Sequence, residues 1–94
     1  MRNYEAAYYL LPSLEEDAVT ALNEKFSSQI AQTGGELLKL NNHGKKRLAY
    51  SIKGQEEGYF VLLEFKGEAG VAKELSRVMR ITDEVVRSMI VRMN

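Results

Sequence analysis

The residues best placed to do chemistry in this sequence are three consecutive cations, Lys45, Lys46 and Arg47, which directly precede an alternating apolar stretch. From Leu48 to Ile52, apolar residues alternate with small or polar ones, as they do in a half-buried strand. A strand holds such cations at a fixed place and angle, which suits an ordered array of phosphates. The stretch therefore predicts a surface for nucleic acid. The alternative is a solvated strand edge on which lysines prevent sheet-to-sheet aggregation.

Residues suited to catalysis or metal binding are few. His43 is the only histidine, its sequence neighbours offer no carboxylate to orient it as a general base, and cysteine is absent. Gly34 and Gly35 follow a predicted helix instead of opening one, so they do not form a phosphate-cradling loop. We therefore expect no enzyme, no metal and no cofactor. We expect His43 to be a solvated loop residue, with an RNA contact as the alternative.

Charge is balanced in total but segregated along the chain. The 94 residues carry 13 basic and 13 acidic side chains, so the formal net charge is zero. Acidic residues cluster at positions 15–17 and 56–57, whereas positions 45–53 contain four cations and no acid. A neutral protein with one cationic surface is expected to bind phosphates only modestly by itself and to need a partner.

The length and composition predict one domain over residues 1–94, because 45% hydrophobic and 28% charged content is ordinary for a small globular domain. The first residues lack the pattern of a signal peptide, and no apolar run reaches membrane-spanning length. We therefore expect a cytoplasmic protein that does not enter membranes.

Hydrophobic periodicity predicts six elements in the order βαββαβ. The strands are expected at 4–11, 36–40 with a continuation at 48–52, 59–65 and 85–93, and the helices over 14–30 and 71–79. The first strand is expected to be buried on both faces, and Ser13 with Glu16 is expected to form a capping box. A bulge is expected over 41–44, and a turn over 54–58 is expected to close a hairpin.

Two βαβ-like halves with right-handed crossovers fold most simply into an α+β, ferredoxin-like plait. Such a plait is a four-stranded antiparallel sheet with both helices on one face. The other face and the sheet edges remain free for RNA or protein. The aromatic residues are mostly expected in the core, and Tyr50 and Tyr59 are interpreted as core or hairpin-pairing rings.

The sequence resembles the family of ribosomal protein six of the bacterial small subunit over its whole length. The stretch from Gly44 to Lys53, GKKRLAYSIK, is similar to the signature of that family. Further similar segments are the opening MRNYE, the GYF that begins at Gly58, and the last part of the chain from Arg80. Leu11–Pro12 departs from the family, in which an Asn–Pro pair is common at this place.

The resemblance implies a structural component of the small subunit, associated with the ribosome and without a small-molecule substrate. It implies binding to the central domain of small-subunit ribosomal RNA together with ribosomal protein eighteen of that subunit. Together, the resemblance and the cationic cluster assign RNA binding to Arg2, Tyr4, Lys45, Lys46, Arg47, Arg87 and Arg92. Arg80 is either a further RNA contact or a cap for its helix. The edge of the second strand is expected to dock protein.

Two other classes of function stay open at this point. A regulator or RNA chaperone with the same fold would bind RNA transiently and would not sediment with small subunits. A pure protein-interaction module would be indifferent to alanine at Lys46, Arg47 and Arg87. An enzyme would need turnover that depends on His43.

Overall fold

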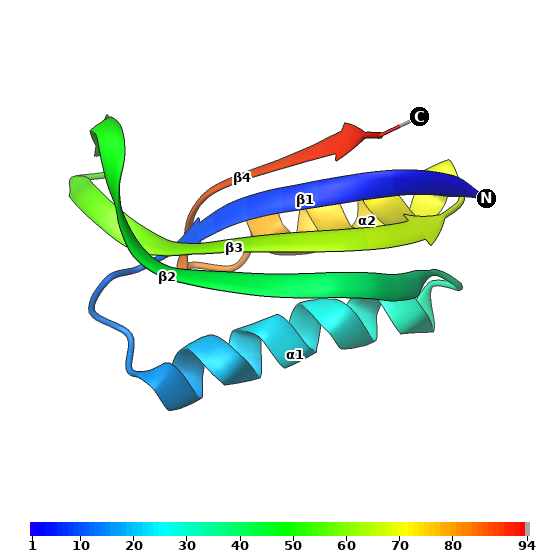
Figure 1. The fold of residues 1–94 in the computed structure, drawn as a ribbon, viewed down its shortest axis with the longest axis horizontal. Coiled ribbons are helices and arrows are strands. Elements are labelled where there is room, and N and C mark those ends of the chain that lie inside the picture. Colours follow the sequence, from blue (N-terminus) through cyan, green and yellow to red (C-terminus); the bar gives the residue numbers. More distant parts are fainter. Residues whose placement is uncertain (94) are drawn as a thin grey trace.

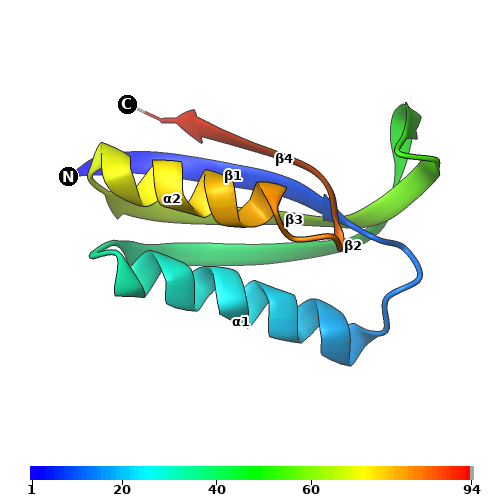
Figure 2. The ribbon, with the colours of Figure 1, turned by 180° about the vertical axis from the view of Figure 1, so that it is seen from behind.

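Four strands and two helices follow one another in the predicted order in the computed structural model, which describes residues 1–93. They are β1 (Arg2–Leu10), α1 (Glu16–Gln32), β2 (Glu36–Ile52), β3 (Gln55–Gly67), α2 (Ala69–Arg80) and β4 (Val85–Arg92). The strands form one antiparallel sheet in the order β2-β3-β1-β4. Both helices lie on the same face of this sheet (Figures 1 and 2). The predicted ferredoxin-like plait is therefore confirmed.

The core lies between the sheet and the helix layer. Alternate residues of β1, from Tyr4 to Leu10, are buried there, whereas Glu5, Ala7 and Tyr9 on the other face are only half-buried. The prediction that β1 is buried on both faces is therefore wrong, because no helix covers the second face. The helices supply the other half of the core with Val19, Phe26, Ile30, Val71, Leu75 and Met79.

One polar pair is enclosed in this core. The hydroxyl of Tyr8 donates a hydrogen bond of 2.6 Å to Oδ1 of Asn23 on α1. The ring of Tyr8 meets Phe26 edge-on at 5.2 Å between centroids. Burial raises the pKa of Tyr8 well above its ordinary value of 10. The pair thus connects α1 to β1, and burial keeps the phenol neutral.

The ends of α1 are set by backbone geometry. Its N-cap is Glu15, which makes no side-chain capping bond, so the predicted capping box at Ser13 is wrong. A turn closed by the bond from the Leu14 amide to the Leu11 carbonyl delays the start of the helix. At the other end, Gly34 adopts a φ of 92°, and the amides of Gly34 and Gly35 bond to the carbonyls of Ala31 and Ile30. That pattern is a Schellman cap.

β2 is a single long strand with three register shifts. One shift lies at Leu38, which is left 48% exposed, and another lies between Asn42 and Lys45, where a bulge was predicted. The β1 register ends at Tyr59, so residues 45–58 form a two-stranded ribbon beyond β1, here called the arm. The green and yellow-green arm rises at one end of the sheet in Figure 1.

The turn of the arm contains two residues. Ile52 pairs with Gln55, and Lys53 and Gly54 between them have φ values of 52° and 78°. Two central residues with positive φ are typical of a type I′ turn, whose twist matches that of the flanking strands. The predicted turn over 54–58 was therefore placed too late, because most of those residues already belong to β3.

The buried hydroxyl of Tyr8 makes stability depend on pH in the alkaline range. Below pH 10 both the folded and the unfolded chain keep this proton, whereas above pH 10 only the folded chain keeps it. The contribution of Tyr8 to the free energy of unfolding is therefore full below pH 10 and falls above it, by up to about 1.4 kcal/mol per pH unit. Urea unfolding of wild type and Tyr8→Phe between pH 8 and 11 measures this difference.

At neutral pH we expect Tyr8→Phe to cost about 1–3 kcal/mol, because Asn23 is left without its donor. The gap between the two proteins should narrow as the pH rises. The two proteins differ only at residue 8, so parallel pH profiles would contradict this account.

Candidate nucleic-acid interface

The three predicted cations lie at the base of the arm. In the register of β2 and β3, Lys45 is opposite Tyr59, Lys46 is opposite Gly58 and Arg47 is opposite Glu57. All three cations are exposed. The ammonium of Lys45 lies 5.5 Å from the centroid of the Tyr59 ring, a cation–π contact that holds it in place.

The three cations form no ion pair in the described part of the chain, although the facing strand of the arm carries Glu56 and Glu57. Among residues 1–93, no ion pair includes Lys45, Lys46 or Arg47. Two cations elsewhere are paired: the Lys66 ammonium lies 3.7 Å from Glu36, and Arg77 binds Glu74 on α2. The hydrogen bond from Arg77 lowers the pKa of Glu74. The arm therefore presents cations that are free to meet an external anion.

The arm is tied to β4 by one side-chain contact. Nη1 of Arg87 donates a hydrogen bond of 3.1 Å to the hydroxyl oxygen of Tyr50. Tyr50 is 62% exposed, so the expectation of a core or strand-pairing ring is wrong. The contact joins the arm to β4 at one end of the sheet (Figure 1). Arg87 therefore joins the same cationic region as the arm.

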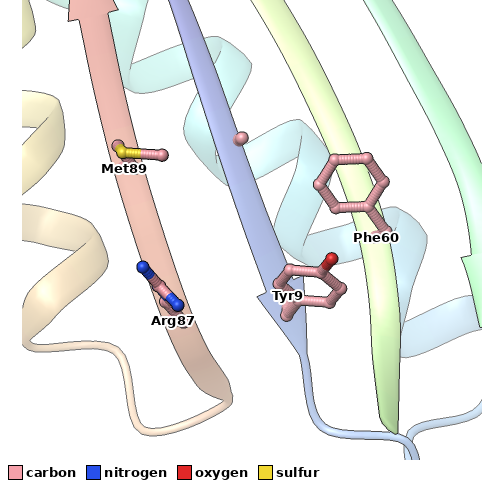
Figure 3. A pocket seen from close by; sticks show the side chains of 5 residues that line it. Tyr9, Phe60, Arg87 and Met89 are labelled. Carbon is pink, nitrogen blue, oxygen red and sulfur yellow. The ribbon is translucent and has the colours of Figure 1, made fainter. Parts of the chain in front are cut away.

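Arg87 also borders a hollow on the face without helices. It is opposite Tyr9 in the register of β1 and β4, and partners in an antiparallel pair share a face. Figure 3 shows Arg87 and Met89 on β4, Tyr9 on β1 and Phe60 on β3 around a hollow of about 290 Å³. The predicted projection of Arg87 onto the open face is confirmed.

Arg2 and Arg92 lie at the opposite end of the sheet. Arg92 pairs with Tyr4, and the amide of Met93 bonds to the carbonyl of Asn3 at 2.8 Å. Arg92 follows Arg87 by five positions in β4, which is roughly 17 Å along a strand. Both arginines at this end are exposed, but the structure does not join them to the cations of the arm.

Tyr4 does not belong to an exposed surface. Only 7% of it is exposed, and its ring stacks on Phe65 at 5.4 Å between centroids, inside the core. The prediction of an RNA contact at Tyr4 is corrected for this reason, because a ring enclosed under the helices cannot reach a nucleotide. The next residue in β1, Glu5, lies on the open face and is half-buried.

A row of aromatic rings crosses the open face and was not among the predicted site residues. The ring of Phe60 lies 4.8 Å from that of Tyr9 and 5.4 Å from that of His43. His43 therefore belongs to a strand and not to a loop. The alternation of Tyr8 with Tyr9 places these two rings on opposite faces, and Glu5, on the face of Tyr9, is the sequence signal that this face is the open one.

Other kinds of site find little support in the described part of the chain. Within residues 1–93, no group of three or more His, Cys, Asp or Glu residues could hold a metal ion. No helix in that range is both long and apolar enough to cross a membrane.

Comparison with known proteins points in one direction. The sequence model of the family "Ribosomal protein S6" matches residues 3–92. Small ribosomal subunit protein bS6 of Desulforamulus reducens is 51% identical over 92 residues, which cover 98% of this chain and 97% of that protein. The protein of the same name from Moorella thermoacetica is 47% identical over 93 residues, covering 99% and 95%. The crystal structure of 30S ribosomal protein S6 from Thermotoga maritima has a TM-score of 0.91 at 27% identity, covering 97% of this chain and 86% of that one.

The contact between Tyr50 and Arg87 predicts a local effect of Tyr50→Phe. This change removes the hydroxyl that accepts the hydrogen bond from Arg87, in an exposed position where the net contribution is about 1 kcal/mol or less. We expect faster amide hydrogen exchange in residues 45–58 with little change in global stability. Tyr9→Phe, on the open face, is the matched control. Unchanged exchange in the arm of Tyr50→Phe would show that this contact does not hold it.

Proposed function

This chain belongs to the ribosomal protein S6 family, and we propose that it binds the central domain of small-subunit ribosomal RNA together with ribosomal protein eighteen. Members of the family are structural components of the small ribosomal subunit and not enzymes, so the expectation of a non-enzymatic protein is confirmed. The family also places the chain on the ribosome in the cytoplasm, as the sequence predicts.

The observation that carries the RNA part of the proposal is that the three cations of the arm form no ion pair among residues 1–93. Lys45, Lys46 and Arg47 are exposed on a ribbon with a fixed register, and Arg87 joins them through Tyr50. An RNA backbone offers phosphates at regular intervals, and cations at fixed positions bind them while releasing counterions. In the proposal, Arg2 and Arg92 form a separate cationic region at the far end of the sheet.

The observation that supports a protein partner is the charge balance of the whole chain. With 13 basic and 13 acidic residues, the long-range field that draws RNA to a basic protein is weak. A partner bound to the same RNA raises the effective concentration of this chain at its site. The β2 edge, the predicted docking surface, carries two exposed leucines, Leu38 at 48% and Leu40 at 36%.

We expect the variant with alanine at Lys46, Arg47 and Arg87 to bind a central-domain RNA fragment roughly tenfold more weakly in the presence of the partner protein. The slope of log affinity against log salt should fall by about one for each phosphate that the variant no longer binds. Filter binding or fluorescence anisotropy at a series of salt concentrations would measure both quantities.

The matched control removes three cations from the helix layer, by alanine at Lys25, Lys73 and Arg77. It has the same net charge as the test variant and should bind like wild type. Equal binding by all three proteins would contradict the proposal and favour a protein-interaction module. A chain that binds this RNA but never sediments with small subunits would favour a transient RNA regulator.

A further inference from the structure

A second hollow lies where the tip of the arm meets the end of the helix layer. Its volume is about 150 Å³, and its lining joins the turn of the arm to two consecutive elements much later in the sequence, α2 and β4. Lys53 contributes from the turn of the arm, Arg80 from the end of α2 and Arg87 from the start of β4. The rest of the lining consists of Met79, Val85 and Val86, which are buried, and Ser88, which is half-buried.

The charges around this hollow have one sign. Three cationic side chains line it and no carboxylate does. Within residues 1–93, neither Lys53, Arg80 nor Arg87 takes part in an ion pair. Like charges that share a small space repel one another, and a bound anion relieves that repulsion. The hollow is therefore suited to a compact anion.

Arg80 is not occupied as a cap for its helix. Backbone amides beyond the helix end, those of Ile81 and Thr82, bond to the carbonyls of Arg77 and Met79. The guanidinium of Arg80 makes no hydrogen bond among the described residues. Its donors are available, and a guanidinium presents them in a fork that matches the oxygens of a phosphate.

The size of the hollow limits what can enter it. A volume near 150 Å³ is ample for one small group, since a single water needs about 10–15 Å³ on the same measure. It lies below the range of about 300–1,000 Å³ that is usual for pockets that enclose larger organic ligands. A group of the size of one phosphate fits this space.

The position of the arm determines whether the hollow exists. Lys53 lies in the type I′ turn, with a φ of 52°, and it lines the hollow because the tip of the arm lies beside the end of α2 and the start of β4. The hydrogen bond between Tyr50 and Arg87 holds the arm in this place. The three cations thus form one site only while the tip of the arm stays beside β4.

We propose that Lys53, Arg80 and Arg87 together bind one phosphate of the ribosomal RNA backbone in this hollow. The source of the phosphate rests on the proposed function, whereas the affinity of the hollow for a phosphate group does not. Lys53 is then an RNA-binding residue outside the predicted set, and Arg80 acts as a ligand and not as a cap.

The test variant is Lys53→Asn. Asn–Gly is the favoured pair for a type I′ turn, so this change removes the charge and preserves the arm. Arg80→Gln is a second variant, which leaves the turn untouched. Lys73→Gln, which removes one exposed cation from α2, is the matched control.

The first measurement uses inorganic phosphate and the free chain, followed by the amide signals of a ¹⁵N-labelled protein. We expect saturable shifts at residues 53, 80 and 87 in wild type and in Lys73→Gln, and their disappearance in Lys53→Asn and Arg80→Gln. Absence of these shifts in wild type would overturn the site, whatever the RNA measurements show.

The second measurement uses the central-domain RNA fragment with the partner protein. We expect Lys53→Asn and Arg80→Gln each to weaken binding by roughly threefold to tenfold and to lower the salt slope by about one. Lys73→Gln should leave both unchanged. If wild type binds the RNA and neither variant weakens that binding, the inference about this hollow is overturned and the proposed function is not. Failure of wild type to bind the RNA would contradict the proposed function, and with it the assignment of this phosphate to ribosomal RNA.

Discussion

The two-residue turn at Lys53 and Gly54 is the constraint on which the cationic surface depends. It fixes the register of a hairpin that extends well past the end of β1. In a strand, a shift of one residue sends every side chain to the other face. The turn, together with the register shift between Arg47 and Ile52, therefore decides where Lys46 and Arg47 point and whether Tyr50 meets Arg87. The buried sheet and helices supply a rigid base, and the arm converts a neutral chain into one with a local cationic surface.

Much of the fold could be predicted because its signals are local. Apolar residues spaced by three or four positions from Leu14 to Ile30 predict a helix that covers a sheet, and Gly34 predicts where it ends. The order of elements then leaves few topologies, since crossovers are right-handed. The cluster Lys45–Arg47 was also recognisable, because three adjacent cations beside an apolar strand have no role in a core.

The remainder depended on contacts between distant residues. In β1 only Glu5 and its neighbour two positions before it mark the open face as polar. Ala7 and Tyr9 share that face and are apolar, so this part of the strand resembles one that is buried on both faces. Register shifts in β2 hide the continuity of the long strand, because they interrupt its alternation. Arg80 and Lys53 belong to elements far apart in the chain, and they line one hollow only because the tip of the arm lies beside the end of α2.

The central claim is that the geometry of the arm, and not charge alone, creates the RNA surface. Gly54→Val tests it most directly, because it keeps every charge and its Cβ meets no atom within 4 Å, yet it opposes the φ of 78° that the turn needs. The measurement is the affinity for central-domain RNA with the partner present, together with NMR signals that confirm an intact core. We predict clearly weaker binding and a lower salt slope. Unchanged binding by a variant whose arm has changed its register would contradict the account.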